Sequence, residues 1–267
     1  MWDLPASCTD CSLTALLYGA SKAGKSTASV TTVEPRLYFD VEAASRFLPI
    51  KRIVWDPAQP PPEYDGSWDT AVVQTRSWGD VKKAYQWLAS GKHPFRSIII
   101  DSITELQNRF LEQEAGRTQP TMQIYGAAYR EVGGLVRDIR DLTVHPSNPI
   151  TQVVMVAMAK EGQDGRWHPW LVGQLATVLP YLLDVTGYLY IDTVADPLTG
   201  DITDTRKLLT RATADFEAGE RVGGRIPRIV ENPNFAHMLA QVFPGEVPPA
   251  PAAEVTDTSN LAEATNE

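Results

Sequence analysis

A segment near the beginning of the chain has the residue types and spacing that bind phosphate. Residues 19–26 match the pattern G-x-x-x-x-G-K-[ST] and read Gly19-Ala20-Ser21-Lys22-Ala23-Gly24-Lys25-Ser26. The glycines let backbone N–H groups turn toward phosphate oxygens, and the helix that follows adds partial positive charge at its N-terminus. Lys25 is expected to reach the β- and γ-phosphates, and the Ser26 hydroxyl to bind Mg²⁺. The segment through Thr27 therefore predicts a phosphate-binding loop (P-loop) for a nucleoside triphosphate with magnesium.

Two other segments place carboxylates at the ends of apolar runs. Residues 97–101 (SIIID) end in Asp101, and P-loop enzymes carry a magnesium-associated carboxylate at such a strand end. Asp101 or Ser102 is also expected to cap the helix that follows, and capping by Ser102 is compatible with magnesium binding by Asp101. Residues 37–42 (LYFDVE) contain Asp40 and Glu42. Hydrolysis needs a group that orients the attacking water, so Glu42 is the candidate base and Asp40 a supporting residue. The alternative is a solvated acidic turn before a helix over residues 43–47.

Alternating strands and helices are predicted to position these residues. Apolar runs predict strands over residues 13–18, 36–40, 71–75, 97–101, 152–157, 185–191 and 207–210. Helices are predicted over residues 25–33, 81–88, 103–113 and 127–142, and the proline-rich residues 56–68 predict a surface loop. This pattern indicates an α/β fold with a mostly parallel central sheet flanked by helices.

Composition limits the class of protein and divides the chain into two parts. The 267 residues are 43% hydrophobic and 21% charged, which is ordinary for a globular protein. Residues 1–243 are predicted to form one ATPase-like core, and the Pro/Ala-rich, acidic residues 244–267 a disordered tail. No apolar run approaches the length of a membrane span, and the N-terminus lacks the pattern of a secretory signal. We therefore expect a cytoplasmic protein without a membrane partner.

Charge and cysteine content exclude two simple kinds of site. The net charge of −9 argues against a basic coat for nucleic acid. The predicted tail holds five acidic residues and no lysine or arginine, so the core carries 28 acidic against 24 basic residues, and a local basic groove remains compatible with it. Cys8 and Cys11 have a C-x-x-C spacing, but nothing else in the sequence completes a structural zinc site. Two reduced thiols are favoured over a redox or metal pair.

The order of the motifs resembles the RecA-like ATPases, in particular their phage-encoded single-domain branch. That branch includes phage nucleotide-binding proteins and ATPases that anneal or recombine single-stranded DNA. The resemblance covers about residues 13–243 and implies ATP with Mg²⁺ as the ligand. It also implies that Glu42 is the catalytic base and that Asp101, in the Walker B position, binds magnesium.

The same resemblance implies a DNA-contacting loop after the strand over residues 152–157. Residues 158–169 contain Lys160, Arg166 and Trp167, a mixture of cationic and aromatic side chains that suits single-stranded DNA. The alternative is a β-hairpin in which Trp167 and Trp170 pack locally. The glutamine that the family carries at this strand end is absent, and Lys160 could sense the γ-phosphate in its place.

A second resemblance concerns the segment Gly219-Glu220-Arg221-Val222-Gly223. It resembles the Lys-Asn-Arg-Phe-Gly motif of RadA-type relatives, which reaches the nucleotide of a neighbouring subunit. This implies Arg221 as an arginine finger acting in trans, and hence a homo-oligomer. The alternatives are a flexible glycine-rich loop, or the same role for Arg225 or Arg228. The acidic tail resembles tails that recruit protein partners, although a merely solubilising end is the alternative.

These observations predict a Mg²⁺-dependent ATPase, stimulated by single-stranded DNA, that acts in phage recombination or annealing in the host cytoplasm. Two alternatives remain open. The first is an ATP-dependent assembly or loading module of a replication complex. The second is a P-loop kinase, which is disfavoured because Pro35 cuts the first helix short and only the cluster around Arg221 and Arg228 resembles a lid.

Overall fold

A computed structural model describes residues 11–195 and 202–245 of the chain. Cys8 and most of the predicted tail, residues 246–267, lie outside the described residues, so the predictions for the cysteine pair and the tail are not addressed by the structure. None of the helices in the described residues is long and apolar enough to cross a membrane.

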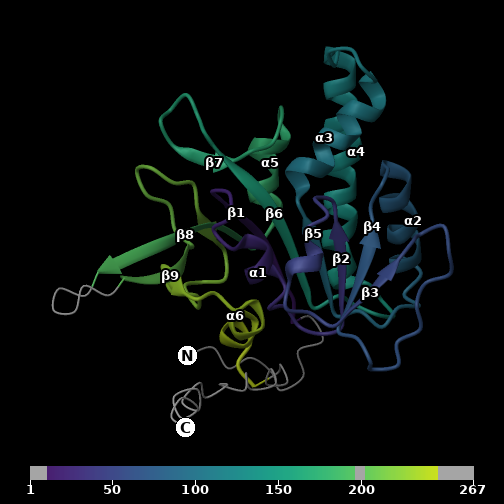
Figure 1. Ribbon diagram of the computed structural model, residues 1–267. Coiled ribbons are helices and arrows are strands. Elements are labelled where there is room, and N and C mark those ends of the chain that lie inside the picture. The colour runs from purple at the N-terminus through teal and green to yellow at the C-terminus, as the bar shows by residue number, and fades with distance from the viewer. Residues whose placement is uncertain (1–10, 196–201, 246–267) are drawn as a thin grey trace, which may run out of the picture.

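A twisted, mostly parallel sheet forms the centre of the protein, as predicted (Figure 1). Neighbouring strands run parallel in the order β8 (Val185–Ala195), β1 (Leu13–Gly19), β6 (Gln152–Glu161), β5 (Ser97–Asp101), β2 (Arg36–Asp40), β4 (Thr70–Gln74) and β3 (Arg52–Trp55). Beyond β8 the sheet continues antiparallel through β9 (Ile202–Leu209) and β11 (Ile229–Glu231). Two short strands are also antiparallel: β10 (Gly219–Glu220) on β8 and β7 (Trp167–Pro169) on β6.

Both faces of the sheet are buried, which explains why its strands are apolar throughout. Every residue of β1 is buried, and its side chains alternate between two hydrophobic clusters. Leu13, Ala15 and Leu17 belong to one cluster, and Leu16 and Tyr18 to the other. Successive side chains of a strand point to opposite faces of the sheet, and here both faces are covered.

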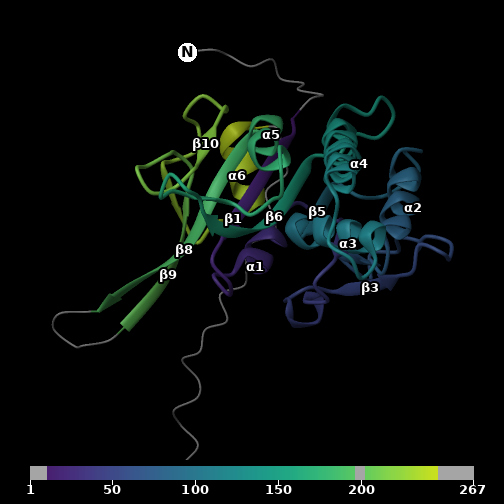
Figure 2. The ribbon, with the colours of Figure 1, turned by 90° about the horizontal axis from the view of Figure 1, so that it is seen from above.

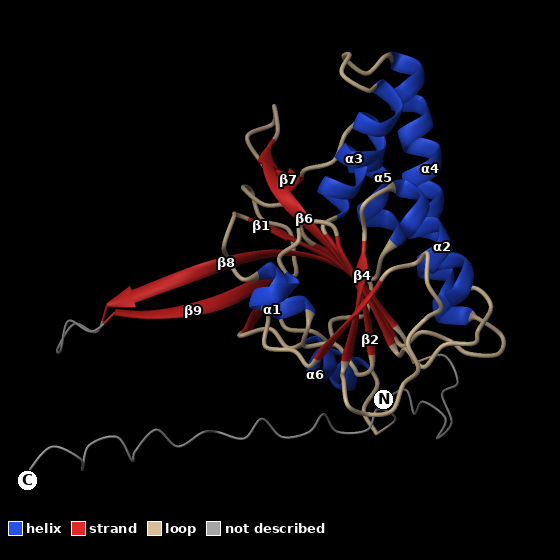
Figure 3. Cartoon of the chain, turned by 45° about the vertical axis from the view of Figure 1, so that its right-hand side comes forward, coloured by secondary structure: helices blue, strands red, loops and turns tan. Residues whose placement is uncertain are grey.

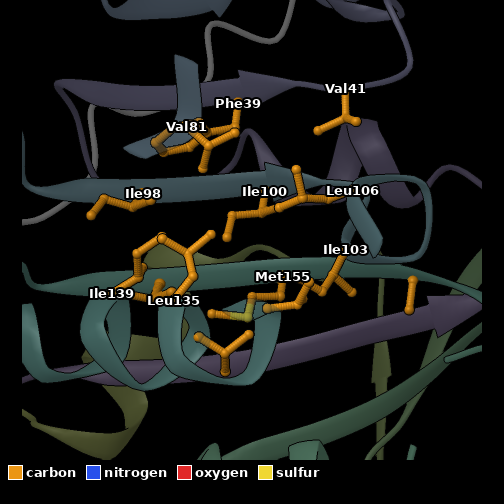
Figure 4. Close-up of a cluster of buried hydrophobic side chains, with 14 of the residues drawn as sticks. Phe39, Val41, Val81, Ile98, Ile100, Ile103, Leu106, Leu135, Ile139 and Met155 are labelled. Atoms are coloured by element: carbon orange, nitrogen blue, oxygen red, sulfur yellow. The ribbon is translucent and has the colours of Figure 1, made fainter. Parts of the chain in front are cut away.

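Helices cover the two faces unequally. One face packs against α2 (Trp78–Leu88), α3 (Ile103–Ala115), α4 (Met122–Asp141) and α5 (Leu175–Leu182). The other packs against α1 (Lys25–Ser29) and α6 (Phe235–Val242). Figure 2 shows α2, α3 and α4 grouped on one side of the molecule and α6 close to β1. Figure 4 shows how Leu135 and Ile139 of α4 meet Ile98 and Met155 of the sheet.

Some predicted boundaries are wrong for local reasons. The helix predicted over residues 25–33 ends at Ser29, because the four residues that follow, Val30 to Val33, are all β-branched and disfavour helix. The helix expected over residues 43–47 is only a 3-10 turn, Ser45–Phe47. The proline-rich segment is a loop as predicted, but it joins β4 to the unpredicted strand β3.

Two strands extend beyond the parallel sheet because each of them pairs there with an antiparallel strand. β6 continues to Glu161 by pairing with β7, and β8 continues to Ala195 by pairing with β9. The β8–β9 ribbon projects away from the body of the protein, as does the helical hairpin of α3 and α4 (Figure 3). The long ribbon begins beside the end of β1, where the predicted P-loop starts.

Candidate nucleotide-binding site

The carboxyl ends of three parallel strands bring the predicted site residues to one edge of the sheet. Gly19 ends β1, Asp101 ends β5 and Asp40 ends β2. The register pairs Asp40 with Asp101 directly, and β6 separates β5 from β1. Ligands of open α/β sheets bind outside this carboxyl edge. The topology therefore gathers segments that are far apart in sequence around the P-loop.

The P-loop has a conformation that depends on its glycines. Gly24 precedes α1 with a φ of 95°, a backbone conformation that residues with a side chain rarely adopt. A Cβ on Gly19 would lie 2.2 Å from the backbone oxygen of Leu189 on β8. Ala20, Ser21, Lys22 and Ala23 form the turn between β1 and α1, and Thr27 lies within α1. The second glycine thus permits the turn, and the first permits its close approach to the sheet.

Lys25 bends back over the loop that precedes it. Its ammonium group donates hydrogen bonds of 2.9 Å to the backbone oxygen of Gly19 and 2.8 Å to that of Ala20. Burial lowers the pKa of Lys25, and the negative charges of Asp101 and Glu42 oppose that effect. The ammonium group therefore lies against the loop and near the two predicted carboxylates, and bound phosphates would replace the backbone oxygens as its hydrogen-bond acceptors.

Asp101 is a buried carboxyl group surrounded by hydroxyl groups. Its side chain accepts a 2.5 Å hydrogen bond from the hydroxyl of Tyr38. Burial raises the pKa of Asp101, while the neighbouring hydroxyls of Ser26 and Tyr38 lower it and the charges of Glu42 and Asp40 raise it. An ionised carboxylate in this position is stabilised by a cation, because burial deprives it of water.

These residues fit a magnesium ion that is shared with phosphates. Ser26 and Asp101 offer hard oxygen atoms, the ligand type that Mg²⁺ prefers. Within the described residues, no cluster of three or more His, Cys, Asp or Glu side chains could hold a metal by itself. Mg²⁺ usually keeps several waters and binds through one or two carboxylates plus substrate phosphates, so this sparse set is sufficient.

Glu42 and Asp40 differ in what they contact. Glu42 is exposed and accepts a 2.5 Å hydrogen bond from the hydroxyl of Ser102. Asp40 accepts backbone hydrogen bonds of 2.9 Å from Ala44 and 3.1 Å from Ser45, so it holds the turn after β2. Asp40 thus supports the loop that carries Glu42, and its own oxygens are engaged by backbone.

Sequence reasoning missed Arg109, which joins two strand ends beside the site. From α3 it donates a 2.6 Å hydrogen bond to the backbone oxygen of Thr75, and it also donates to that of Val41. Val41 directly precedes Glu42, so the guanidinium group holds the backbone next to the candidate base. The feature of the sequence that could have drawn attention to Arg109 is its spacing of four residues from Glu105, with which it forms a 3.5 Å ion pair.

Residues 158–169 form a hairpin, which is the arrangement named above as the alternative to a DNA-contacting loop. Lys160 pairs with His168 across β6 and β7. Trp167 packs against the main core, and its backbone oxygen accepts a 2.9 Å hydrogen bond from the Tyr18 hydroxyl. Arg166 donates to the backbone oxygen of Phe216 at 3.3 Å. Of the three residues predicted to contact DNA, Lys160 is the exposed one.

Arg221 lies at the opposite, amino-terminal edge of the sheet from the P-loop of its own chain. It donates a 2.8 Å hydrogen bond to Asp184, which immediately precedes β8. Asp184 also accepts hydrogen bonds from the backbone nitrogen and the hydroxyl of Thr14, at 2.8 and 2.7 Å. Arg221 therefore lies too far from the P-loop of its own chain to contact a nucleotide bound there. Its action on the nucleotide of a neighbouring subunit stays a prediction.

Comparison with known families agrees with this geometry. The family model described as an AAA domain matches residues 12–222, which include the P-loop, Glu42 and Asp101. No curated protein matches the chain with significance. Because the family match covers most of the chain and contains all of the assembled site, the protein belongs to the AAA domain family of P-loop NTPases.

Proposed function

We propose that the protein is a RecA-like ATPase that binds and hydrolyses ATP with Mg²⁺ and acts on single-stranded DNA in phage recombination or annealing. The observation that supports hydrolysis is the assembly of Lys25, Ser26 and Asp101 at one sheet edge with Glu42 held beside them by Ser102. Phosphoryl transfer depends mostly on positioning and on charge stabilisation, which these groups supply.

Each residue has a distinct part in the proposed reaction. Lys25 stabilises negative charge on the β- and γ-phosphates, and Glu42 orients the attacking water. Ser26 and Asp101 would hold Mg²⁺, which neutralises charge on the phosphates when it is bound. The buried position of Asp101 strengthens its interaction with a cation, since electrostatic interactions are stronger away from water.

A cleft beside the hairpin supports the proposed role of single-stranded DNA. It has a volume of about 820 Å³ and lies between the β6–β7 hairpin and α5. Trp170 is 43% exposed at its wall, and the Lys160 ammonium group lies 5.8 Å from the centre of the Trp170 ring. Tyr181 adds a second exposed ring. Exposed aromatic rings with a cation nearby can stack bases and attract the backbone.

The cleft is not uniformly basic, which limits where a strand could run. Glu161, Asp164 and Glu217 line it as well. Asp164 and Glu217 both contact His168, at 3.0 and 2.8 Å, so part of their charge is engaged. A nucleic acid would therefore contact the Trp170 side of the cleft, and Trp170 replaces Trp167 as the stacking residue that we propose.

Steady-state ATP hydrolysis with and without single-stranded DNA at low salt tests the proposal. Wild-type protein should hydrolyse ATP, DNA should stimulate it, and Lys25→Ala should abolish both. Trp170→Ala should keep basal hydrolysis but weaken DNA binding roughly tenfold, because one stacked base contributes on this order. Tyr125→Ala removes an exposed aromatic ring from α4 and serves as the control.

The outcomes separate the alternatives. Hydrolysis that is indifferent to DNA would contradict the recombination role and leave an assembly or loading module. Phosphate transfer to a small acceptor instead of water would indicate a kinase. Mixing Arg221→Ala with Lys25→Ala subunits tests the trans finger, because restored hydrolysis requires one subunit to complete the site of another. The homo-oligomer, the partner of the tail and the location in the host cytoplasm stay predictions.

A further inference from the structure

The β8–β9 ribbon carries an arginine toward the P-loop of the same chain. In the register of the ribbon, Leu189 pairs with Leu208 and Ile191 with Arg206, so these four residues share one face. Leu189 and Leu208 pack in the cluster that contains Ala23 of the P-loop and Ala28 of α1. The face of the ribbon that bears Arg206 is therefore the face on which the P-loop lies. Figures 1 and 2 show β9 beside α1.

Arg206 lies directly on the second glycine of the P-loop. A Cβ on Gly24 would be 2.4 Å from Nε of Arg206 and 2.9 Å from its Cδ. Any side chain at position 24 would displace the arginine, in addition to the strain of the φ of 95°. Gly24, the residue before Lys25, is thus in contact with β9, which lies beyond β8 in the sheet. None of the predicted motifs lies on β9.

The positive charge of Arg206 has no protein partner in the part of the chain that the structure describes. Arg206 is exposed, and its guanidinium group makes no ion pair or side-chain hydrogen bond with residues 11–195 or 202–245. Its neighbour Lys207 faces the other side of the ribbon and is paired with Asp192 at 2.6 Å and Glu231 at 3.5 Å. Two adjacent cations of one strand thus differ: Lys207 is neutralised, and Arg206 lies against Gly24, the residue that precedes Lys25 in the phosphate-binding loop.

We propose that Arg206 is a phosphate-binding residue that acts in cis, donating to the phosphate chain of the nucleotide held by the P-loop of its own chain. This rests on the proposed function and deepens it by adding a residue to the same site. A guanidinium group suits the task, since its planar set of N–H donors matches phosphate oxygens. Arg206 differs from Arg221, which lies at the opposite edge of the sheet and could reach only a neighbour.

Equilibrium binding of a fluorescent, non-hydrolysable ATP analogue tests the proposal on the intact chain. Arg206→Ala should weaken binding by about tenfold to a hundredfold, the usual effect of losing a hydrogen bond to a charged group. Arg206→Gln keeps most of the aliphatic stem and should weaken binding similarly with an unchanged melting temperature. Arg206→Lys should recover part of the affinity. Lys207→Ala is the matched control and should bind within about twofold of the wild type, because one salt-bridged surface charge contributes little.

Each outcome supports or overturns the inference. Wild-type or tighter binding by Arg206→Ala and Arg206→Gln would overturn it, since Arg206 would then cover Gly24 without contacting phosphate. A mixture of Arg206→Ala and Lys25→Ala subunits should not regain hydrolysis, and recovery would overturn action in cis. If the wild-type protein does not bind the analogue, the proposed function itself fails. If it binds and the Arg206 variants bind equally well, only this inference fails.

Discussion

The hydroxyl of Ser102 donates a 2.5 Å hydrogen bond to Oε1 of Glu42. The same hydroxyl accepts a 3.2 Å hydrogen bond from the backbone nitrogen of Glu105, which caps α3. One side chain therefore connects the loop after β2, the end of β5 and the first turn of a helix. The candidate base is thereby held next to Asp101, which directly precedes Ser102.

Glu42→Gln should separate binding from hydrolysis. The amide keeps the size of the side chain but cannot take up a proton, so kcat should fall by about two orders of magnitude or more. Affinity for a non-hydrolysable ATP analogue should remain near that of the wild type, because Glu42 does not form the P-loop. Phosphate release and equilibrium binding measure the two quantities. Glu63→Gln, in the proline-rich loop, is the control, and a wild-type kcat in Glu42→Gln would contradict the role.

Ser102→Ala should lower both stability and rate. Loss of the α3 cap should cost about 1 kcal/mol of unfolding free energy, and release of Glu42 should lower hydrolysis roughly tenfold. Chemical denaturation and steady-state kinetics measure the two effects. Ser77→Ala removes the equivalent cap of α2, away from the site, and should cost similar stability without a loss of rate. Equal rates in the two variants would show that Ser102 only caps the helix.

Asp101→Asn should stabilise the nucleotide-free protein at neutral pH. Burial raises the pKa of Asp101 above its value in the unfolded chain, so folding favours the protonated form and ionisation opposes it. The variant should gain about 1 kcal/mol, or roughly 2–4 °C in melting temperature, without magnesium or nucleotide.

The pH dependence of this gain gives a second check on Asp101. Below the pKa of the unfolded carboxyl, both states are protonated and the gain should vanish. It should grow as pH rises through the folded pKa, where the wild type loses stability. Melting temperatures of the wild type and the variant, measured across this pH range, test the prediction. A variant that melts below the wild type at neutral pH would contradict it.

His168 should make the β6–β7 hairpin more stable under mildly acidic conditions. Partial burial acts to lower the pKa of His168, but hydrogen bonds with Glu217 and Asp164 outweigh it and raise the pKa above 6.5. The stabilisation is fully present below the unfolded pKa and is lost as pH rises through the folded one. Hydrogen exchange of the hairpin amides, corrected for intrinsic rates, should show this loss. His168→Gln should remove the pH dependence, and an unchanged profile in that variant would refute the assignment.

The buried parallel strands were the most predictable part of the fold. Residues 36–40 and 97–101 were predicted with the bounds that the structure has, because strands covered on both faces are continuous apolar runs. The short strands at the edges, β3, β10 and β11, were missed. Apart from Trp55 their residues are exposed or only partly buried, and they are stabilised by pairing with distant strands more than by their own pattern.

The sequence by itself determined that the chain is a P-loop protein and predicted the ligand class and the residues of the loop, because that motif is contiguous and its chemistry is local. Only the tertiary structure decided which distant groups meet it. The pairing of Asp40 with Asp101, the contacts of Arg109 with two strand ends and the contact of Arg206 with Gly24 all depend on strand order and register. Strand order and register are set by the packing free energy of the whole sheet, which depends on all of its strands together. A local sequence pattern does not contain this information.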